Sequence, residues 1–547
     1  MRDTAQSRRR GATPTMWRTT CALFALAVMS FRLTGVHAAR LGNAATYETT
    51  SFKVEYGTDY KIVTTKALSG SSMTPKTYIL YSGASQPTIA SAPAGAAYFK
   101  TPVQKVATGL TIAMGYLEQL GLRDKLALVD PSSVHAPCIQ RGEALGNIEG
   151  SHSEYPSYNS TTQITTYGAT WIASINNYNS ANAASPITMN IVDDWGFGST
   201  NTAIDVEFVA SHTTLGMLQR TEQVKFLSLF FDLEAEAEAY YNDQVDRWNL
   251  QTRVMRQTRA RGHIRSGVSC AWISVDAAYT WNGVNYPAAY KISWAQFKRD
   301  ICEAAGMSIH IPAGATSSAG SYSYTSLSAF HTDMASIDII IDESYAYSPS
   351  TYTTAAALAH LGFTTSMGLR ALSRDTGRLL RLDKHVSDTN NGANGFAHTG
   401  QVEGMTWFED SFVHPALVLQ DLTRIVYWEN VTGVEPIAPG CPKFFRDMNP
   451  LPNTDDGVVV VTGDSAAECT LWDNARTQKT CLAKELEQRQ TIEGLFLSAD
   501  TSDTRSMTVT VAASVSAAVV AIVACLFFKY RDTRRNAAYL PETIYYK

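Results

Sequence analysis

The segment from Trp272 to Trp294 is rich in aromatic residues whose chemistry suits ligand binding. Flat rings bind a bulky, amphipathic small molecule through their area, while tyrosine hydroxyl and indole N–H groups fix its orientation. The alternative role for the same rings is core packing, and Trp272, in the middle of an apolar run, is expected to be a core residue. Tyr279 and Trp281 fall in a predicted loop and are the better ligand-binding candidates. The further candidates in this segment are Tyr286 and Tyr290.

A second set of candidates follows predicted strands. In an open α/β sheet, ligands lie outside the carboxyl ends of the strands. This rule favours Asp342, Glu343 and Tyr345, which end or follow the apolar run 337–342, and Trp195 in the first half of the chain. The alternative for Asp342 and Glu343 is that they form a turn.

Two arginines and a late aromatic complete the candidate site. Arg370 and Arg374 follow Met367-Gly368-Leu369, and a guanidinium fork suits the oxygens of a hydroxamate, citrate or catecholate chelate. The alternative for these arginines is a surface ion pair. Trp407 and Glu409 precede an apolar run at 415–422 and face the same choice between ligand contact and structure.

The patterns that could indicate catalysis are incomplete. Residues 458–465 are similar to the nucleophile block of a GDS-type esterase, but no histidine follows His414 to deprotonate the serine. The triplet 375–377 is similar to that of an aspartic protease, whose mechanism needs two such carboxylates. We therefore expect no enzyme activity and no intrinsic cofactor. The histidines are scattered, yet ligands gathered from distant positions could still hold Zn²⁺ or Mn²⁺, which stays an alternative.

Composition indicates an exported globular protein. The chain has 547 residues, a formal net charge of −5, 45% hydrophobic and 10% aromatic residues, and no long basic run in its middle, so nucleic acid is excluded as a partner. Asn159 and Asn430 stand in glycosylation sequons. An even number of cysteines outside the predicted signal and span suggests disulfides, with the pairing left open. These cysteines are Cys138, Cys270, Cys302, Cys441, Cys469 and Cys481.

Both ends of the chain carry targeting patterns. Arginines, a short apolar run and small residues before Ala39 predict a signal peptide over 1–38. An uncharged apolar segment over 507–528 is long enough to cross a bilayer, and basic residues follow it. We therefore expect one transmembrane helix in the plasma membrane or an endomembrane, an extracellular or lumenal ectodomain, and a cytoplasmic tail over 529–547. Asn536 and Tyr539 in this tail resemble an NPxY internalisation signal for an endocytic adaptor.

Between these ends the sequence alternates helical and strand patterns, which predicts an α/β fold. Apolar periodicity predicts a helix over 103–121, and short apolar runs predict strands at 126–131, 205–211, 267–273 and 337–342, with a late strand turning into a helix at 415–422. Residues 150–201 are interpreted as long loops. A long helix over 232–261, capped by Asp232, divides an N-terminal lobe (44–231) from a C-terminal lobe (262–431), before a Cys- and Pro-rich stalk over 432–506.

Several of these segments resemble one family. Pro102-Val103-Gln104-Lys105-Val106-Ala107, continuing to Tyr116-Leu117-Glu118-Gln119-Leu120-Gly121, is similar to the first strand and helix of iron-siderophore and cobalamin binding proteins of the periplasmic type. Leu145-Gly146-Asn147, the approach to the long helix at 222–234, and 415–422, similar to a closing "PDLVL.DL", complete the resemblance, which covers 52–431. The membrane-anchored eukaryotic members, similar to the diatom ferrichrome-binding protein, combine such a domain with an anchor.

The resemblance implies a fold and a ligand class. It implies two Rossmann-like lobes joined by one long helix, little hinge motion, and an organic metal chelate bound in the cleft between the lobes. A ferric siderophore is the expected ligand, with cobalamin as an alternative. A receptor of this kind would need a route for its cargo into the cell, and endocytosis through the tail would supply it.

Overall fold

The computed structural model describes most of the chain between the two predicted targeting segments. The described residues are 40–41, 45–68, 74–90, 92–131, 134–151, 153, 157–159, 164–166, 168–281, 284–316, 320–346, 348–373, 375–387, 404–428, 444–448 and 457–461. All of them belong to one compact unit of the chain. Within that part no helix has the length and apolar character that crossing a bilayer requires. The predicted signal, span and tail, most of the predicted stalk, and Arg374 and Asn430 lie outside the described residues.

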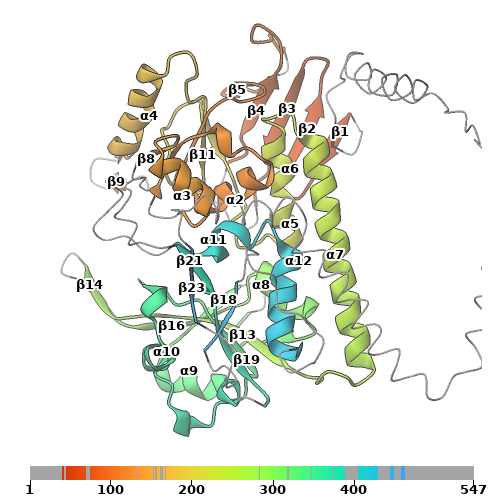
Figure 1. The fold of residues 1–547 in the computed structure, drawn as a ribbon, viewed down its shortest axis with the longest axis vertical. Helices are drawn as coiled ribbons and strands as arrows, with labels where there is room; N and C mark the ends of the chain where they lie inside the picture. Colours follow the sequence, from red (N-terminus) through yellow and green to blue (C-terminus); the bar gives the residue numbers. More distant parts are fainter. Residues whose placement is uncertain are drawn as a thin grey trace, which may run out of the picture. The chain divides into compact units, whose positions relative to one another are not determined.

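The chain begins with a five-stranded sheet of order β1-β2-β3-β4-β5. Its strands are β1 (Thr46–Glu48), β2 (Phe52–Tyr56), β3 (Tyr60–Thr65), β4 (Thr77–Tyr81) and β5 (Ala97–Lys100), antiparallel except that β5 runs parallel to β4. Helix α6 (Gln223–Ser228) lies beside this sheet (Figure 1), and an aromatic cluster attaches the sheet to α6 and the residues after it. The Tyr78 ring centroid lies 6.2 Å from that of Phe226 and 5.8 Å from that of Phe230.

A parallel sheet of order β12-β11-β6-β7-β8 follows. Its strands are β6 (Val106–Thr108), β7 (Leu126–Val129), β8 (Glu149–Gly150), β11 (Met189–Val192) and β12 (Asp205–Glu207). The helices of this part are α2 (Thr111–Gln119), α3 (Pro137–Ala144), α4 (Ala169–Ala181) and α5 (Met217–Thr221), and β9 (Ser157–Asn159) pairs with β10 (Ile164–Thr166) as a separate hairpin. We call residues 45–231, with both sheets, the N-terminal region.

Two predictions for the N-terminal region were wrong. The helix predicted from residue 103 is the strand β6 followed by the helix α2, because the apolar residues of the short strand continue the helical spacing. The segment 150–201, interpreted as loops, contains α4 and the central strand β11. Trp171 and Ile175 of α4 are buried, and the Trp171 indole N–H donates to Asn190 Oδ1 at 3.2 Å, so a few buried residues order a stretch that is otherwise polar.

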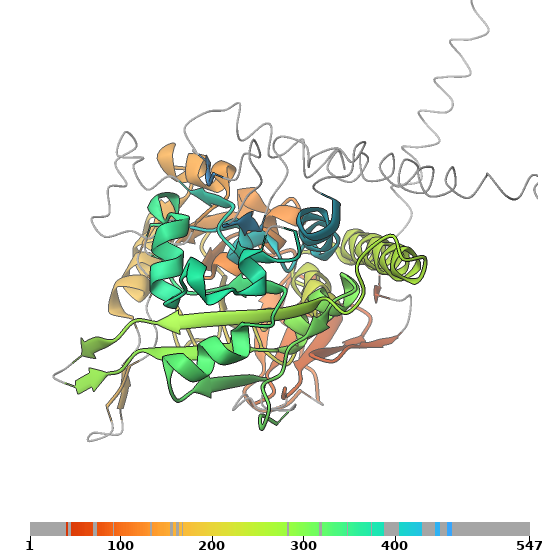
Figure 2. The ribbon, with the colours of Figure 1, turned by 90° about the horizontal axis from the view of Figure 1, so that it is seen from below.

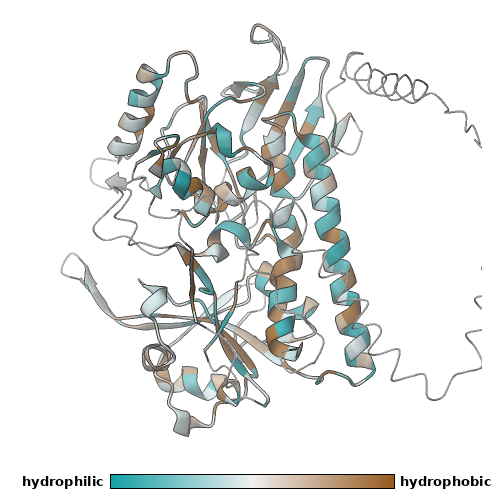
Figure 3. Ribbon diagram, viewed as in Figure 1, coloured by the Kyte–Doolittle hydropathy of each residue, from teal (hydrophilic) through white to brown (hydrophobic). Residues whose placement is uncertain are grey.

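The long helix is α7 (Glu234–Ala260), which is largely hydrophilic along its length (Figure 3). Acidic Glu234 and Glu236 lie in its first turn and Arg259 in its last, which suits the helix dipole. The prediction that Asp232 caps α7 was wrong. Leu233 occupies the N-cap, and Asp232, with a φ of 56°, instead pairs with Lys61 Nζ of β3 at 2.7 Å.

The C-terminal region, residues 262–461, contains a seven-stranded sheet. Its strands are β13 (Ser269–Asp276), β16 (Ala289–Ser293), β17 (Ser308–Ile309), β18 (Ser321–Tyr324), β19 (Ile339–Asp342), β20 (Arg378–Arg381) and β22 (Arg446–Asp447), of which β13, β19 and β20 are mutually parallel. Separate pairs are β14 (Tyr279–Trp281) with β15 (Val284–Tyr286), and β21 (His385–Ser387) with β23 (Val459–Val461). The helices are α8 (Gln296–Ala304), α9 (Leu327–Met334), α10 (Thr354–Leu361), α11 (Thr406–Asp410) and α12 (Pro415–Thr423).

The run 415–422, predicted to start as a strand, is helical throughout. Pro415 lies in the first turn of α12, where its fixed φ favours a helix, and nearly all of the helix is buried. The Gln251 side-chain amide of α7 donates to the Ala416 carbonyl oxygen at 3.1 Å, and α12 is visibly apolar beside α7 (Figure 3). An apolar run buried on several sides does not by its periodicity distinguish a strand from a helix.

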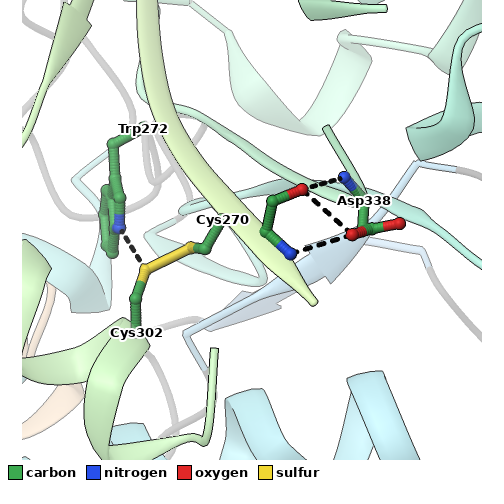
Figure 4. Close-up of a disulfide and its surroundings, with 5 residues drawn as sticks. Cys270, Trp272, Cys302 and Asp338 are labelled. Atoms are coloured by element: carbon green, nitrogen blue, oxygen red, sulfur yellow. Dashed lines mark hydrogen bonds between the residues drawn. A yellow bond between two sulfur atoms is a disulfide. The ribbon is translucent and has the colours of Figure 1, made fainter. Parts of the chain in front are cut away.

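A disulfide joins Cys270 of β13 to Cys302 of α8 (Figure 4). The Trp272 indole N–H donates to Cys302 Sγ at 3.4 Å, so this tryptophan packs in the core, as predicted. Cys138 is also disulfide-bonded. Cys441, Cys469 and Cys481 lie outside the described residues, and the disulfides expected of them stay untested.

The N-terminal and C-terminal regions meet where α11 packs on α2. The helices approach so closely that a Cβ at Gly115 of α2 would overlap the Glu409 carbonyl oxygen. The buried Glu409 carboxylate accepts the backbone N–H of His135 at 2.7 Å and that of Ala136 at 3.2 Å, just before α3 begins. Glu409 is therefore a structural residue rather than the ligand contact that its position in the sequence allowed.

Replacing Gly115 by alanine tests this contact. In an isolated helix the change would stabilise by about 1 kcal/mol, but overlap with the Glu409 backbone should reverse the sign and destabilise by about 2–3 kcal/mol. Urea unfolding measures the difference. Gly83→Ala is the control, since its Cβ would lie 3.5 Å from the nearest backbone oxygen, an ordinary contact. A stabilised Gly115→Ala protein would contradict the close packing of α2 and α11.

Candidate ligand-binding edge

The loops at the carboxyl ends of the N-terminal parallel strands pack directly on one another. Asp130 follows β7, and its Oδ2 accepts both the backbone N–H and the hydroxyl of Ser153, each at 2.8 Å. Ser153 in turn lies so close to Gly109, after β6, that a Cβ there would overlap its hydroxyl. Gly109 after β6, Asp130 after β7 and Ser153 after β8 thus meet at one edge of the sheet.

Trp195 projects from this edge, in the loop after β11. The buried carboxylate of Asp193, the first residue after the strand, accepts the backbone N–H of Trp195 at 2.9 Å and that of Phe197 at 2.8 Å. Such a turn fixes the backbone of a short loop through the aspartate side chain. The Trp195 side chain is 73% exposed on this fixed loop.

The C-terminal region repeats this arrangement after β19. Asp342 is fully buried, and its Oδ1 accepts the backbone N–H of Ser344 at 2.9 Å, while Arg381 of β20 pairs with its other oxygen. The Ser344 hydroxyl accepts the backbone N–H of Val275 at 2.8 Å, which ties the loop to the end of β13. Tyr345 follows and is 60% exposed. A buried aspartate at the end of a central strand therefore presents an exposed aromatic residue in each region.

Three predicted ligand-binding residues pack into the interior, where Asp342 and Trp407 are buried and Tyr290 is partly buried. The Tyr290 ring stacks on that of Phe330, with centroids 5.7 Å apart, and Trp407 packs against Trp272 with centroids 5.5 Å apart. Asp342 is enclosed by its hydrogen bonds and its ion pair. The contacts of these three residues are with other parts of the protein.

The predicted charged contacts have structural partners. Glu343 pairs with the buried Lys298 of α8. Arg370 Nη1 lies 3.5 Å from Asp338 Oδ1, and Asp338 precedes β19, so Arg370 is beside the amino end of the strand rather than the carboxyl end. This pairing is the surface ion pair that the sequence left open as the alternative for Arg370. Arg374 lies outside the described residues.

The remaining aromatic candidates belong to the β14–β15 hairpin, which projects from the end of β13 (Figures 1 and 2). In the backbone register of the hairpin, Tyr279 is paired with Tyr286 and Trp281 with Val284. Thr280 and Asn285 are paired between them and are hydrogen-bonded to each other at 2.6 Å. Tyr286 is 37% exposed.

Sequence reasoning missed the residues that position the two exposed aromatics, namely Gly109, Ser153, Asp193 and Ser344. A usable signal was present, since an aspartate ends or directly follows a short apolar run before Trp195 and before Tyr345. The chemistry available at this edge is aromatic and hydrogen-bonding. Within the described ranges, no group of three or more His, Cys, Asp and Glu side chains is arranged as a set of metal ligands.

The comparisons with known proteins found similar proteins among the solved structures. No protein-family model and no curated protein matches the sequence. A periplasmic heme binding protein from Pseudomonas aeruginosa is 16% identical over 59% of this chain and 92% of its own, with a TM-score of 0.35. A periplasmic binding protein from Veillonella parvula is 12% identical over 66% and 96%, with a TM-score of 0.38. The FhuD protein from S. pseudintermedius is 12% identical over 59% and 91%, with a TM-score of 0.35.

Bacterial periplasmic heme-binding and iron-uptake proteins are therefore among the structural neighbours. The identities and TM-scores of these neighbours are too low to assign a family or a ligand to this chain.

Glu143 of α3 is the titratable group near this edge whose pKa moves most clearly. Burial, reinforced by the nearby negative charge of Asp130, raises the pKa of Glu143 from 4.5 to about 8. Glu143 Oε1 is buried without a hydrogen-bond partner. The folded protein therefore favours the protonated carboxyl group at neutral pH.

The pH dependence of unfolding tests this. Because the folded pKa exceeds the unfolded one, the contribution of Glu143 to stability is complete below pH 4.5 and is lost as the pH rises towards 8, by up to about 1.4 kcal/mol per pH unit. Glu143→Gln removes the penalty, so the stability of this variant relative to the wild type should increase between pH 5 and pH 8 in urea titrations. Glu149→Gln, at an exposed site, should show no such trend. A constant difference between Glu143→Gln and the wild type would contradict the assignment.

Proposed function

We propose that this protein is a non-enzymatic receptor that captures an organic metal chelate, with a ferric siderophore as the leading ligand. The observation that carries the proposal is the pair of exposed aromatics, Trp195 and Tyr345, each held at the carboxyl end of a central strand by a buried aspartate. Ligands of open α/β sheets bind at such edges. The resemblance of residues 52–431 to siderophore and cobalamin binding proteins supplies the ligand class.

In this proposal the N-terminal and C-terminal regions are two Rossmann-like lobes joined by α7, and the ligand lies between their carboxyl edges. The contact of Glu409 with the start of α3 supports a fixed angle between the lobes, because a buried carboxylate that has accepted two backbone N–H groups is costly to expose. A site that is fixed before binding loses little conformational freedom when it captures a rigid chelate.

The alternative proposals concern the identity of the ligand and not the position of the site. Cobalamin and heme offer the same combination of a flat apolar surface and polar edge groups. A directly ligated Zn²⁺ or Mn²⁺ ion would instead need His and carboxylate ligands. The hairpin residues Tyr279, Trp281 and Tyr286 are proposed to extend the aromatic wall of the site for the larger chelates.

The cellular part of the proposal rests on the sequence. We infer a signal peptide over 1–38, a single span over 507–528, a cytoplasmic tail, and residence in the plasma membrane or an endomembrane. Asn159 is the last residue of β9, and its glycosylation is part of the proposal. No intrinsic cofactor and no nucleic-acid partner are part of the proposal.

Tryptophan fluorescence tests the ligand class. The purified protein should show saturable quenching by a ferric hydroxamate, and parallel titrations with heme, cobalamin, Zn²⁺ and Mn²⁺ separate the alternatives. Trp195→Ala and Tyr345→Ala should each weaken chelate binding by about 1–3 kcal/mol, the usual effect of removing an aromatic contact, with the melting temperature unchanged. Binding by the Trp195 variant is followed by calorimetry. Leu145→Ala, at another exposed apolar residue, is the control. Absence of saturable binding by any chelate would rule out the proposal.

Uptake by cells tests the tail. Cells expressing the protein truncated after Arg535, or carrying Tyr539→Ala, should bind labelled chelate at the surface but internalise it several-fold more slowly than wild-type cells. Tyr530→Ala, close to the predicted span, serves as the matched control. Uptake at the wild-type rate by both altered proteins would show that the tail is not the entry signal.

A further inference from the structure

A second feature lies beside Trp195, on the side facing the first sheet. An open groove of about 840 Å³ runs between the start of β4, the residues before β5, and the loop after β11. The residues that matter for its chemistry are Lys76, Tyr78, Asp193, Asp194, Trp195 and Glu207. Trp195 therefore borders both the carboxyl edge described above and this groove.

Two of the carboxylates that line the groove are fully occupied by the protein. Asp193 accepts the backbone N–H groups of Trp195 and Phe197. Asp205 accepts the Asn190 amide at 2.7 Å, the Ser199 hydroxyl at 2.7 Å, and both the hydroxyl and the backbone N–H of Thr200. Several hydrogen-bond donors thus stabilise the negative charges of Asp193 and Asp205, and these bonds fix the conformation of the loops.

Asp194 differs from both of them. Its side chain is only 4% exposed, and its Oδ1 is buried with no hydrogen-bond partner. The basic group beside it is His212, whose Nε2 lies 3.9 Å from Asp194 Oδ2, beyond hydrogen-bonding distance. Burial lowers the pKa of His212, and its Nδ1 accepts the backbone N–H of Thr214, so the ring is neutral at neutral pH. A buried carboxylate without a cationic partner is costly to the fold.

Glu207 is the second incompletely paired carboxylate in the groove. Its Oε1 lies 2.8 Å from Lys76 Nζ, but its Oε2 is buried without a hydrogen-bond partner. Burial raises the pKa of Glu207 despite Lys76, and the negative charges of Asp194 and Asp205 add to the effect. A bound cation would relieve this repulsion.

The surrounding sequence does not supply such a cation. No lysine or arginine occurs between Arg141 and Arg220, whereas the same stretch contains Glu143, Glu149, Glu154, Asp193, Asp194, Asp205 and Glu207. Among the six groove residues named above, Lys76 carries the one positive charge. An ammonium group has three N–H donors for the unpaired carboxylate oxygens, and an exposed indole ring such as that of Trp195 attracts a cation.

We propose that this groove binds an organic ammonium group, held by Asp194 and Glu207 beside the Trp195 ring. Resting on the proposed function, the inference names the preferred cargo: a chelate that carries a positively charged amine arm, with the metal-bearing part at the carboxyl edge and the arm in the groove. Trp195 borders both sites, so one ligand can contact both at once.

A matched pair of ligands tests the inference on the full-length protein. One is a linear ferric trihydroxamate that ends in a primary ammonium group, and the other is the same chelate with this amine acetylated. The wild type should bind the ammonium form about tenfold more tightly or better, as expected for charge-assisted hydrogen bonds. Asp194→Asn and Glu207→Gln should reduce the ratio to below about threefold, the loss expected when one charged acceptor becomes neutral. Glu55→Gln, the same kind of change at an exposed residue paired with Lys53, should leave the ratio unchanged.

The outcomes separate this inference from the proposed function. Equal affinity of the wild type for the two chelates would overturn the groove assignment and leave chelate binding intact. If neither chelate binds, the proposed function fails, and titration with a free aliphatic diamine decides the groove. Saturable diamine binding that is weakened in Glu207→Gln but not in Glu55→Gln supports the ammonium site, and its absence refutes it.

Discussion

The contact between the Glu409 carboxylate and the backbone before α3 is the interaction on which the arrangement of the two regions depends. It is possible because Gly115 has no side chain. The backbone of α11 at Glu409 can therefore lie directly against the backbone of α2. The carboxylate accepts N–H groups at the start of a helix, where negative charge is favoured. Because α2 follows β6 and α3 follows β7, this single contact also fixes the strands whose carboxyl ends carry the candidate site.

Much of the fold could be predicted from the sequence, and the misses have physical causes. The buried strands β7 and β19 and the helix α7 carry long or strongly apolar patterns, which are reliable signals. The apolar periodicity did not reveal the strand β6, because Val106 and Ala107 continue the spacing of the next helix. The strand β11 was hidden because its four buried residues stand in a polar segment. The helix α12 is buried on several sides, so its sequence lacks the periodicity that separates helix from strand.

The sequence identified candidate residues where a general rule applied. It could not identify the role of a residue that depends on partners far away in the chain. The rule that ligands lie at carboxyl ends of strands selected Trp195 and Tyr345, both of which are exposed there. The sequence could not indicate that Phe330 covers Tyr290 or that Trp272 covers Trp407, because these partners lie 40 and 135 positions away in the chain. The same limit applies to Arg370, whose partner Asp338 draws it to the other end of β19.

The stretch without lysine or arginine between Arg141 and Arg220 also has a kinetic consequence. Four of its carboxylates, those of Asp193, Asp194, Asp205 and Glu207, line the groove. The field of these charges extends over roughly a Debye length, about 8 Å at physiological ionic strength. Such a field raises the rate at which oppositely charged molecules meet a site and hardly affects their departure. In the proposed function, the rate at which a cationic chelate meets the groove would then depend on the salt concentration and would be highest at low ionic strength.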